Sequence, residues 1–119
     1  MAGLPKQARL LNKADYNAVF TKSVKVSDSL FLILIHKTSN PDSRLGLVIS
    51  KKVDKRAVQR NRIKRISRES FRNTTFVTSC DFVVLARPKV AHLSNKEIFS
   101  SINKLWSQAE SKINRIRKK

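Results

Sequence analysis

Basic residues are concentrated in one stretch of the chain, between residues 51 and 72. Ten lysines and arginines occur there: Lys51, Lys52, Lys55, Arg56, Arg60, Arg62, Lys64, Arg65, Arg68 and Arg72. Only Asp54 and Glu69 offset their charge. Solvated helices usually alternate acidic and basic residues at a spacing of four, because like charges at that spacing repel. The uncompensated repulsion here favours a surface that binds phosphate groups over one that is merely solvated.

The same stretch has the spacing of an amphipathic helix, and we expect Asp54 to be its N-cap. One side, expected to face a core, carries residues at i, i+3, i+7 and i+8: Ile63, Ile66, Ser70 and Phe71. Another side, with Arg62 beside it, carries residues at steps of four, three and four: Asn61, Arg65, Arg68 and Arg72. We call these four residues the basic stripe, along which a polyanion could lie.

Residues able to do catalytic chemistry are sparse. No pair among the eight acidic residues shows the convergence that metal-assisted phosphodiester cleavage needs. His36 and His92 lie in different segments with no cysteine or acidic cluster nearby, so we expect no metal site. The single cysteine, Cys80, excludes an internal disulfide and fits a reducing compartment. The sequence predicts a binding protein rather than one whose own side chains catalyse a reaction.

Composition limits the class of partner. The chain has 119 residues, 40% of them hydrophobic, which predicts a single domain over residues 1–119 with its own core. A net charge of +18 attracts nucleic acid or an anionic membrane. We favour nucleic acid, because arginine is abundant and its planar group suits phosphates and base edges. No apolar run reaches the roughly 18 to 20 residues that span a bilayer, so we expect a soluble, cytoplasmic protein without membrane contact.

Hydrophobic periodicity predicts the order α-β-β-β-α-β-α, an α+β sandwich of helices on a four-stranded sheet. A first helix is expected after Asn12, its proposed cap, with Asp15 in its first turn. Three strands should then form an antiparallel meander, and the fourth, continuous in Val, Leu and Phe, should be central or covered. Their expected positions are residues 24–26, 30–37, 44–52 and 81–87. Gly46 in the third strand allows close approach of a neighbour.

Two sets of side chains in this scheme bear on function. Tyr16, Val19 and Phe20 share one side of the first helix, either all in the core or with one aromatic ring exposed for stacking on nucleotides. The last helix begins with a Ser94–Glu97 capping box. Its apolar side recurs at steps of three and four: Ile98, Ile102, Leu105, Trp106, Ala109, Ile113 and Ile116.

The Arg60-Asn61-Arg62 motif extends this interpretation. Together with its setting, LGLVISKKV followed by AVQRNRIKRISRESF, it resembles the signature of the bacterial ribonuclease P protein subunit. The likeness continues in the helix ending at Phe20, the FLILIHK and DFVVLARP strands and the terminal helix, in the same order. It implies a left-handed crossover through the basic helix, against the usual right-handed rule.

The resemblance also implies function. Ribonuclease P removes the 5′ leader from precursor tRNA, and its catalytic centre with Mg²⁺ lies in an RNA subunit that this protein would assist, without an obligate protein partner. The expected contacts to the catalytic RNA are Lys51, Lys52, Arg56, Arg60, Asn61, Arg62, Lys64, Arg65, Arg68 and Arg72. Those expected in a channel for the single-stranded leader are Arg9, Tyr16, Phe20, Leu32, Leu34, Val84 and Ala86. Some relatives have a tyrosine where Leu34 stands, a group this channel lacks.

Two other functions remain as alternatives. A structural RNA-binding protein, such as a ribosomal one, would share the basic surface but need no leader channel. A DNA-binding helix-turn-helix protein is disfavoured, because no second helix lies near the basic one in the chain.

Overall fold

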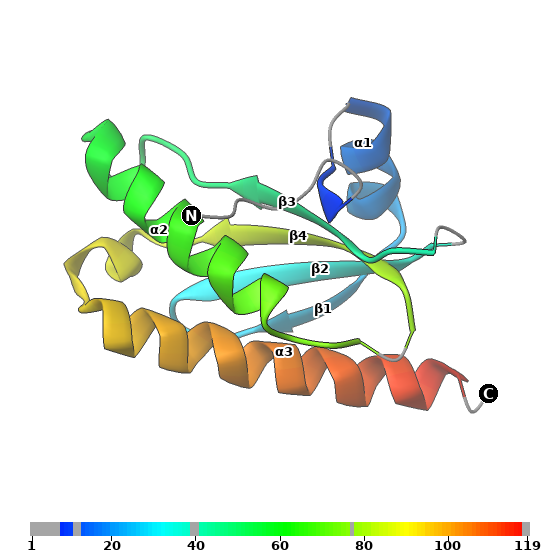
Figure 1. The fold of residues 1–119 in the computed structure, drawn as a ribbon. Helices are drawn as coiled ribbons and strands as arrows, with labels where there is room; N and C mark the ends of the chain where they lie inside the picture. The colour runs from blue at the N-terminus through cyan, green and yellow to red at the C-terminus, as the bar shows by residue number, and fades with distance from the viewer. Residues whose placement is uncertain (1–7, 11–12, 39–40, 77, 118–119) are drawn as a thin grey trace.

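Four strands form one mixed sheet, with helices on both of its faces (Figure 1). The computed structural model describes residues 8–10, 13–38, 41–76 and 78–117. For residues 114–117 it describes the backbone alone. The elements in order are α1 (Lys13–Thr21), β1 (Val24–Ser27), β2 (Phe31–Lys37), β3 (Arg44–Val48), α2 (Ala57–Arg72), β4 (Cys80–Ala86), the short 3-10 helix η2 (Pro88–His92) and α3 (Asn95–Arg117). This order confirms the predicted α+β fold. Asn12, the expected cap of α1, lies outside the described residues.

The expected meander of three antiparallel strands is wrong. The strand order is β1-β2-β4-β3, with β4 antiparallel to β2 and parallel to β3. The strand β4, with its continuous apolar run from Phe82 to Ala86, takes the interior position predicted for it, where it has a neighbour on each side and a covered face above and below. Since β4 pairs along β2, the strand β3 is displaced one place outward.

The basic helix α2 connects the two parallel strands. In Figure 1, α2 lies in front of β3 and β4, on the same face as α3. The chain moves from β3 to β4 through this helix in the left-handed sense, which the family resemblance implied and which the general rule for parallel strands would not predict.

The larger core lies between the sheet and the helices α2 and α3. Its aromatic centre contains Phe71, Phe76, Phe82 and Trp106, with ring centroids 4.6 to 5.8 Å apart. The predicted apolar side of α3 is buried from Ile98 to Ile113, while the side chain of Ile116 is outside the described part. This core holds α2 with its polar side outward.

A smaller cluster lies on the opposite side of the sheet, which we call the α1 face. It contains Leu10, Val19, Leu34 and Val83. Gly46 allows the ring of Tyr16 to approach the β3 backbone closely, because a Cβ atom at this position would be 2.7 Å from the ring, and the ring would have to shift. The helix α1 therefore rests directly on the backbone of β3.

The predicted N-terminal cap is present in α3 and absent in α2. The capping box of α3 is present: the backbone N–H of Glu97 donates to Ser94 Oγ (3.2 Å), and the N–H of Ser94 to Glu97 Oε1 (3.3 Å). Asp54, however, is not the N-cap of α2, a place taken by Arg56. The carboxylate of Asp54 instead accepts the Arg56 backbone N–H at 2.8 Å, an Asx turn that bends the chain before the helix begins.

Candidate nucleic-acid interface

The basic stripe lies on the exposed side of α2. All four residues, Asn61, Arg65, Arg68 and Arg72, are exposed, whereas Ile63, Ile66, Ser67, Ser70 and Phe71 of the same helix are buried. Within the described part of the chain, the side chains of Arg65 and Arg68 form neither a hydrogen bond nor an ion pair. Their charge is therefore available to an external anion, on a helix whose other side is anchored in the core.

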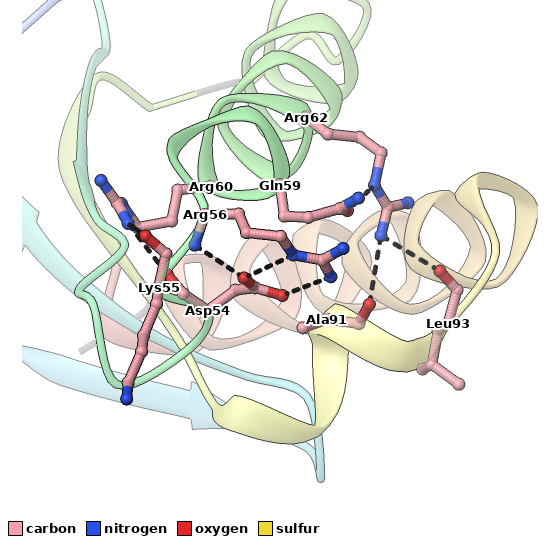
Figure 2. Close-up of polar contacts among 8 residues, drawn as sticks. All are labelled: Asp54, Lys55, Arg56, Gln59, Arg60, Arg62, Ala91 and Leu93. Atoms are coloured by element: carbon pink, nitrogen blue, oxygen red, sulfur yellow. Dashed lines mark hydrogen bonds and ion pairs between the residues drawn. The ribbon is translucent and has the colours of Figure 1, made fainter.

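Arg62 has different surroundings from the stripe. Its Nε donates to Gln59 Oε1 (2.9 Å), and its Nη2 reaches the carbonyl oxygens of Leu93 (3.3 Å) and Ala91 (3.4 Å), as Figure 2 shows. Its Nη1 donates to Asn95 Oδ1. These bonds join α2 to the connection between η2 and α3, so this guanidinium is half-buried and committed within the protein.

Arg60 and Arg56 organise the turn before α2. The Nη1 of Arg60 donates to the carbonyl oxygens of Asp54 (2.9 Å) and Lys55 (2.8 Å) (Figure 2). The guanidinium of Arg56 pairs with the Asp54 carboxylate, Nη2 to Oδ2 at 3.0 Å. Hydrogen bonds from Arg56 lower the pKa of Asp54 to about 2. The turn is thus held by two arginines, while Lys51, Lys52 and Lys55 beside it are exposed.

The residues expected in a leader channel do not all share a face. Arg9 is exposed, Tyr16 is half-buried, and Phe20 is 48% exposed, so the open alternative for the first helix resolves to Val19 in the core and Phe20 outside. Leu32 and Leu34 lie on the α1 face.

Val84 and Ala86, however, belong to the opposite face, in the core beneath α2 and α3. The register pairs Leu32 with Leu85 and Leu34 with Val83, so the predicted β4 residues are displaced by one position, which reverses the face.

The sequence interpretation missed Val48, Val83 and Leu85, which complete the apolar part of the α1 face. Alternation could not reveal the outward residues of β4, because five consecutive residues of this strand, Cys80 to Val84, are buried. Only the pairing with β2 identifies them.

An ion-pair network fixes α1 against the sheet. Arg44 binds both carboxylate oxygens of the buried Asp81, Nε to Oδ1 at 2.8 Å and Nη2 to Oδ2 at 2.7 Å. Its Nη1 reaches Asp15 Oδ2 in the first turn of α1 at 3.3 Å. The hydrogen bonds that Arg44 donates to the Asp81 carboxylate raise the pKa of Arg44, as expected of a bidentate pair. These contacts hold the aromatic side of α1 in place above β3 and β4.

Other reactive groups have ordinary surroundings. Cys80 is buried, and this burial raises the pKa of its thiol to about 11. Across the described ranges, no three or more His, Cys, Asp or Glu side chains are grouped so that they could hold a metal ion. None of the helices in that part of the chain is both long and apolar enough to span a bilayer.

Exposed Arg65 and Arg68 on a helix anchored in the core, together with the exposed ring of Phe20 on α1, are features typical of an α+β nucleic-acid-binding protein. Comparison with known families agrees: residues 4–110 match the model of the family Ribonuclease P. The chain belongs to the ribonuclease P protein family.

Individual relatives support this assignment. The chain is 44% identical to the ribonuclease P protein component of Marinomonas sp. (strain MWYL1), over 91% of this chain and 83% of that protein. It is 40% identical to the component of Legionella pneumophila (strain Corby), over 93% and 96%. Among solved structures, the RNase P protein of Staphylococcus aureus has a TM-score of 0.80 at 28% identity, covering 87% of this chain and 95% of that one. The Thermotoga maritima protein has a TM-score of 0.71 at 28% identity, covering 82% and 94%.

Proposed function

We propose that this chain assists an RNA-catalysed reaction, the endonucleolytic removal of the 5′ leader from precursor tRNA. The observation that carries the proposal is the basic stripe, whose Arg65 and Arg68 are exposed and have no acidic partner within the described residues. Cations held on a rigid helix reduce the repulsion between two RNA molecules that must come together. The protein then supplies binding and positioning, and the cytoplasm is where it would meet both RNAs.

The catalytic centre and its Mg²⁺ belong, in this proposal, to the RNA subunit. Several acidic side chains support this, because their oxygens are engaged in the protein's own structure. Asp81 binds Arg44, and Asp54 binds Arg56. Asp28 Oδ1 accepts the backbone N–H groups of Leu30 and Phe31. A carboxylate used in this way contributes to the fold rather than to a metal centre.

The catalytic RNA would dock on the basic stripe and the lysines beside it. The exposed members of this surface are Lys51, Lys52, Arg56, Asn61, Arg65, Arg68 and Arg72, and the half-buried Lys64 adds its charge. Arg60 and Arg62 would act mainly as positioning residues, since their guanidinium groups bind carbonyl oxygens of the protein.

The leader of precursor tRNA would lie on the α1 face. Phe20 offers an exposed ring for stacking on an unpaired base, and Leu32, Val48 and Leu85 provide partly exposed apolar surface on the sheet. Stacking is tolerant of sequence, because every base has a π face. A surface of this kind suits leaders of different sequence.

Reconstitution tests the proposal. Purified protein added to the catalytic RNA at low Mg²⁺ concentration should restore precursor cleavage that either component lacks alone. The holoenzyme should also bind precursor tRNA more tightly than mature tRNA. A structural RNA-binding protein would bind the RNA without restoring cleavage, and cleavage by the protein alone would contradict the proposal.

A further inference from the structure

A hollow of about 210 Å³ lies at the β3 edge of the sheet, between the two surfaces described above. Its polar walls come from the segment before α1 (Arg9), from α1 (Tyr16) and from α2 (Lys64 and Arg68). Leu45 and Leu47 of β3 also line it. The hollow thus lies between the α1 face and the exposed side of α2 that carries the basic stripe.

The charges around this hollow are uncompensated. Within the described residues, the side chains of Arg9, Lys64 and Arg68 form neither a hydrogen bond nor an ion pair. The backbone of Arg9 is nevertheless fixed to β3. It forms a β-bridge with Leu45, and the backbone N–H of Leu10 donates to the carbonyl oxygen of Leu45 at 3.1 Å. Three cations, one before α1 and two on α2, therefore line the hollow, and no acidic residue does.

The chemistry of the walls selects a phosphodiester. Arginine and lysine donate charge-assisted hydrogen bonds to phosphate oxygens, and the tyrosine hydroxyl can add a neutral one. The leucines of β3 offer apolar surface suited to the ribose beside that phosphate. A single strand can bend one phosphate into a recess, whereas a duplex presents its phosphates to open surfaces.

We propose that this hollow binds one backbone phosphate of the precursor leader, where the strand leaves the α1 face and approaches α2. The inference rests on the proposed function and assigns it a defined subsite. Tyr16 argues for the leader over the catalytic RNA, because its ring lies on the α1 face above Gly46 and also lines the hollow. Lys64 and Arg68, at the border of the surface proposed for the catalytic RNA, would hold the same leader phosphate from the other side of the hollow.

Single neutral linkages in the leader test the proposal. Precursor tRNAs carrying one methylphosphonate each, at successive leader positions, are titrated with the reconstituted holoenzyme. One position should lose roughly ten-fold in affinity, the loss of one charge-assisted contact, while the others change by about two-fold or less. With Arg68→Gln, precursor affinity should already be lower, and the penalty at the sensitive position should fall to about two-fold.

Arg65→Gln is the matched control, because Arg65 lies on the same helix but does not line the hollow. This variant should weaken binding while the position-specific penalty stays roughly ten-fold. Equal small effects at every position, or a penalty unaltered by Arg68→Gln, would overturn the subsite. If the holoenzyme still binds precursor tRNA more tightly than mature tRNA, the proposed function stands without the subsite. If the unaltered holoenzyme shows no such preference for unmodified precursor, the proposed function itself is contradicted.

Discussion

Arg60, Asn61 and Arg62 follow one another in the chain, yet their side chains have different surroundings. Asn61 is exposed, while Arg60 and Arg62 donate to carbonyl oxygens of the protein. The side-chain spacing on a helix, about 100° per residue, separates neighbours in this way. The Arg60-Asn61-Arg62 motif therefore combines one exposed residue, available to RNA, with two arginines that bind the protein itself.

Arg62→Ala should lower stability more than it changes RNA electrostatics. The variant leaves the carbonyl oxygens of Ala91 and Leu93 without this donor, and we expect a loss of about 1 to 3 kcal/mol in the free energy of unfolding, measured by denaturant titration. The slope of log K against log[salt] should stay unchanged.

Arg65→Ala is the comparison for Arg62→Ala. It should leave stability within about 0.5 kcal/mol and reduce the magnitude of the salt slope by roughly 1. A reduced slope with unchanged stability in the Arg62 variant would show that Arg62 contacts phosphate instead.

Phe20→Ala should weaken binding of precursor tRNA more than binding of mature tRNA. Loss of one base–aromatic stack costs about 1 to 3 kcal/mol, which Kd measurements for the two RNAs would resolve. The neighbouring Val19 is fully buried, so Val19→Ala should instead lower the unfolding free energy by about 2 kcal/mol. If Phe20→Ala weakens binding of both RNAs equally, the ring does not contact the leader.

Among the elements, α2 determines where the basic stripe lies, and α3 holds α2. The indole Nε1–H of Trp106 on α3 donates to Ser70 Oγ on α2 at 2.8 Å, within the buried core. Ser70 also bonds the side chain of Asn103. These polar contacts and the rings of Phe71 and Trp106 set how α2 lies across β3 and β4.

Ser70→Ala tests how much the hydrogen bond between Trp106 and Ser70 contributes to stability. The buried indole N–H would lose its acceptor, which costs about 1 to 3 kcal/mol in unfolding free energy, measured by denaturant titration. Ser100→Ala on the exposed side of α3 is the control and should change stability by less than about 0.5 kcal/mol. Equal stability of the two variants would mean that the hydrogen bond does not hold α2.

The turn before α2 should respond to acid. The folded-state pKa of Asp54 is lowered from 3.8 to about 2, so its ion pair with Arg56 stabilises the fold above pH 4 and is lost as the pH falls toward 2. NMR titration of the Asp54 carboxyl should show a midpoint near 2. In Arg56→Gln the midpoint should rise toward 3.8, and a midpoint already there in the unaltered protein would contradict the contact.

At the scale of the whole molecule, the two proposed RNA-binding surfaces lie on opposite faces of the sheet, in a chain whose net charge is +18. Figure 1 shows α2 on one side of the sheet and α1 on the other. Residues of both helices line the hollow at β3. Two RNAs can therefore approach from different sides and meet at one edge. This separation of roles depends on β3 being the outer strand.

Salt dependence tests the electrostatic basis of assembly. If about six to eight phosphates are neutralised, log K for association with the catalytic RNA should fall against log[salt] with a slope of about −4 to −7. A titration between low and moderate salt measures it. A slope shallower than about −2 would contradict an assembly dominated by charge.

Local periodicity was sufficient for the helices, because each helix shows its buried side within a few turns of its own sequence. Ile63, Ile66 and Phe71 of α2, and the apolar residues of α3 from Ile98 to Ile113, are buried as predicted. The exposed charge of Arg65 and Arg68 followed from the same spacing.

The sequence by itself determined the element order, the apolar sides of the helices and the basic stripe. Tertiary structure decided the strand order, the face of Val84 and Ala86, the partners of Arg62 and the hollow that brings Arg9 to Arg68. The physical reason is that these features depend on contacts between residues far apart in the chain. Strand pairing and register are set by the packing of the whole sheet, and a strand buried on both faces carries no alternation from which its register could be read.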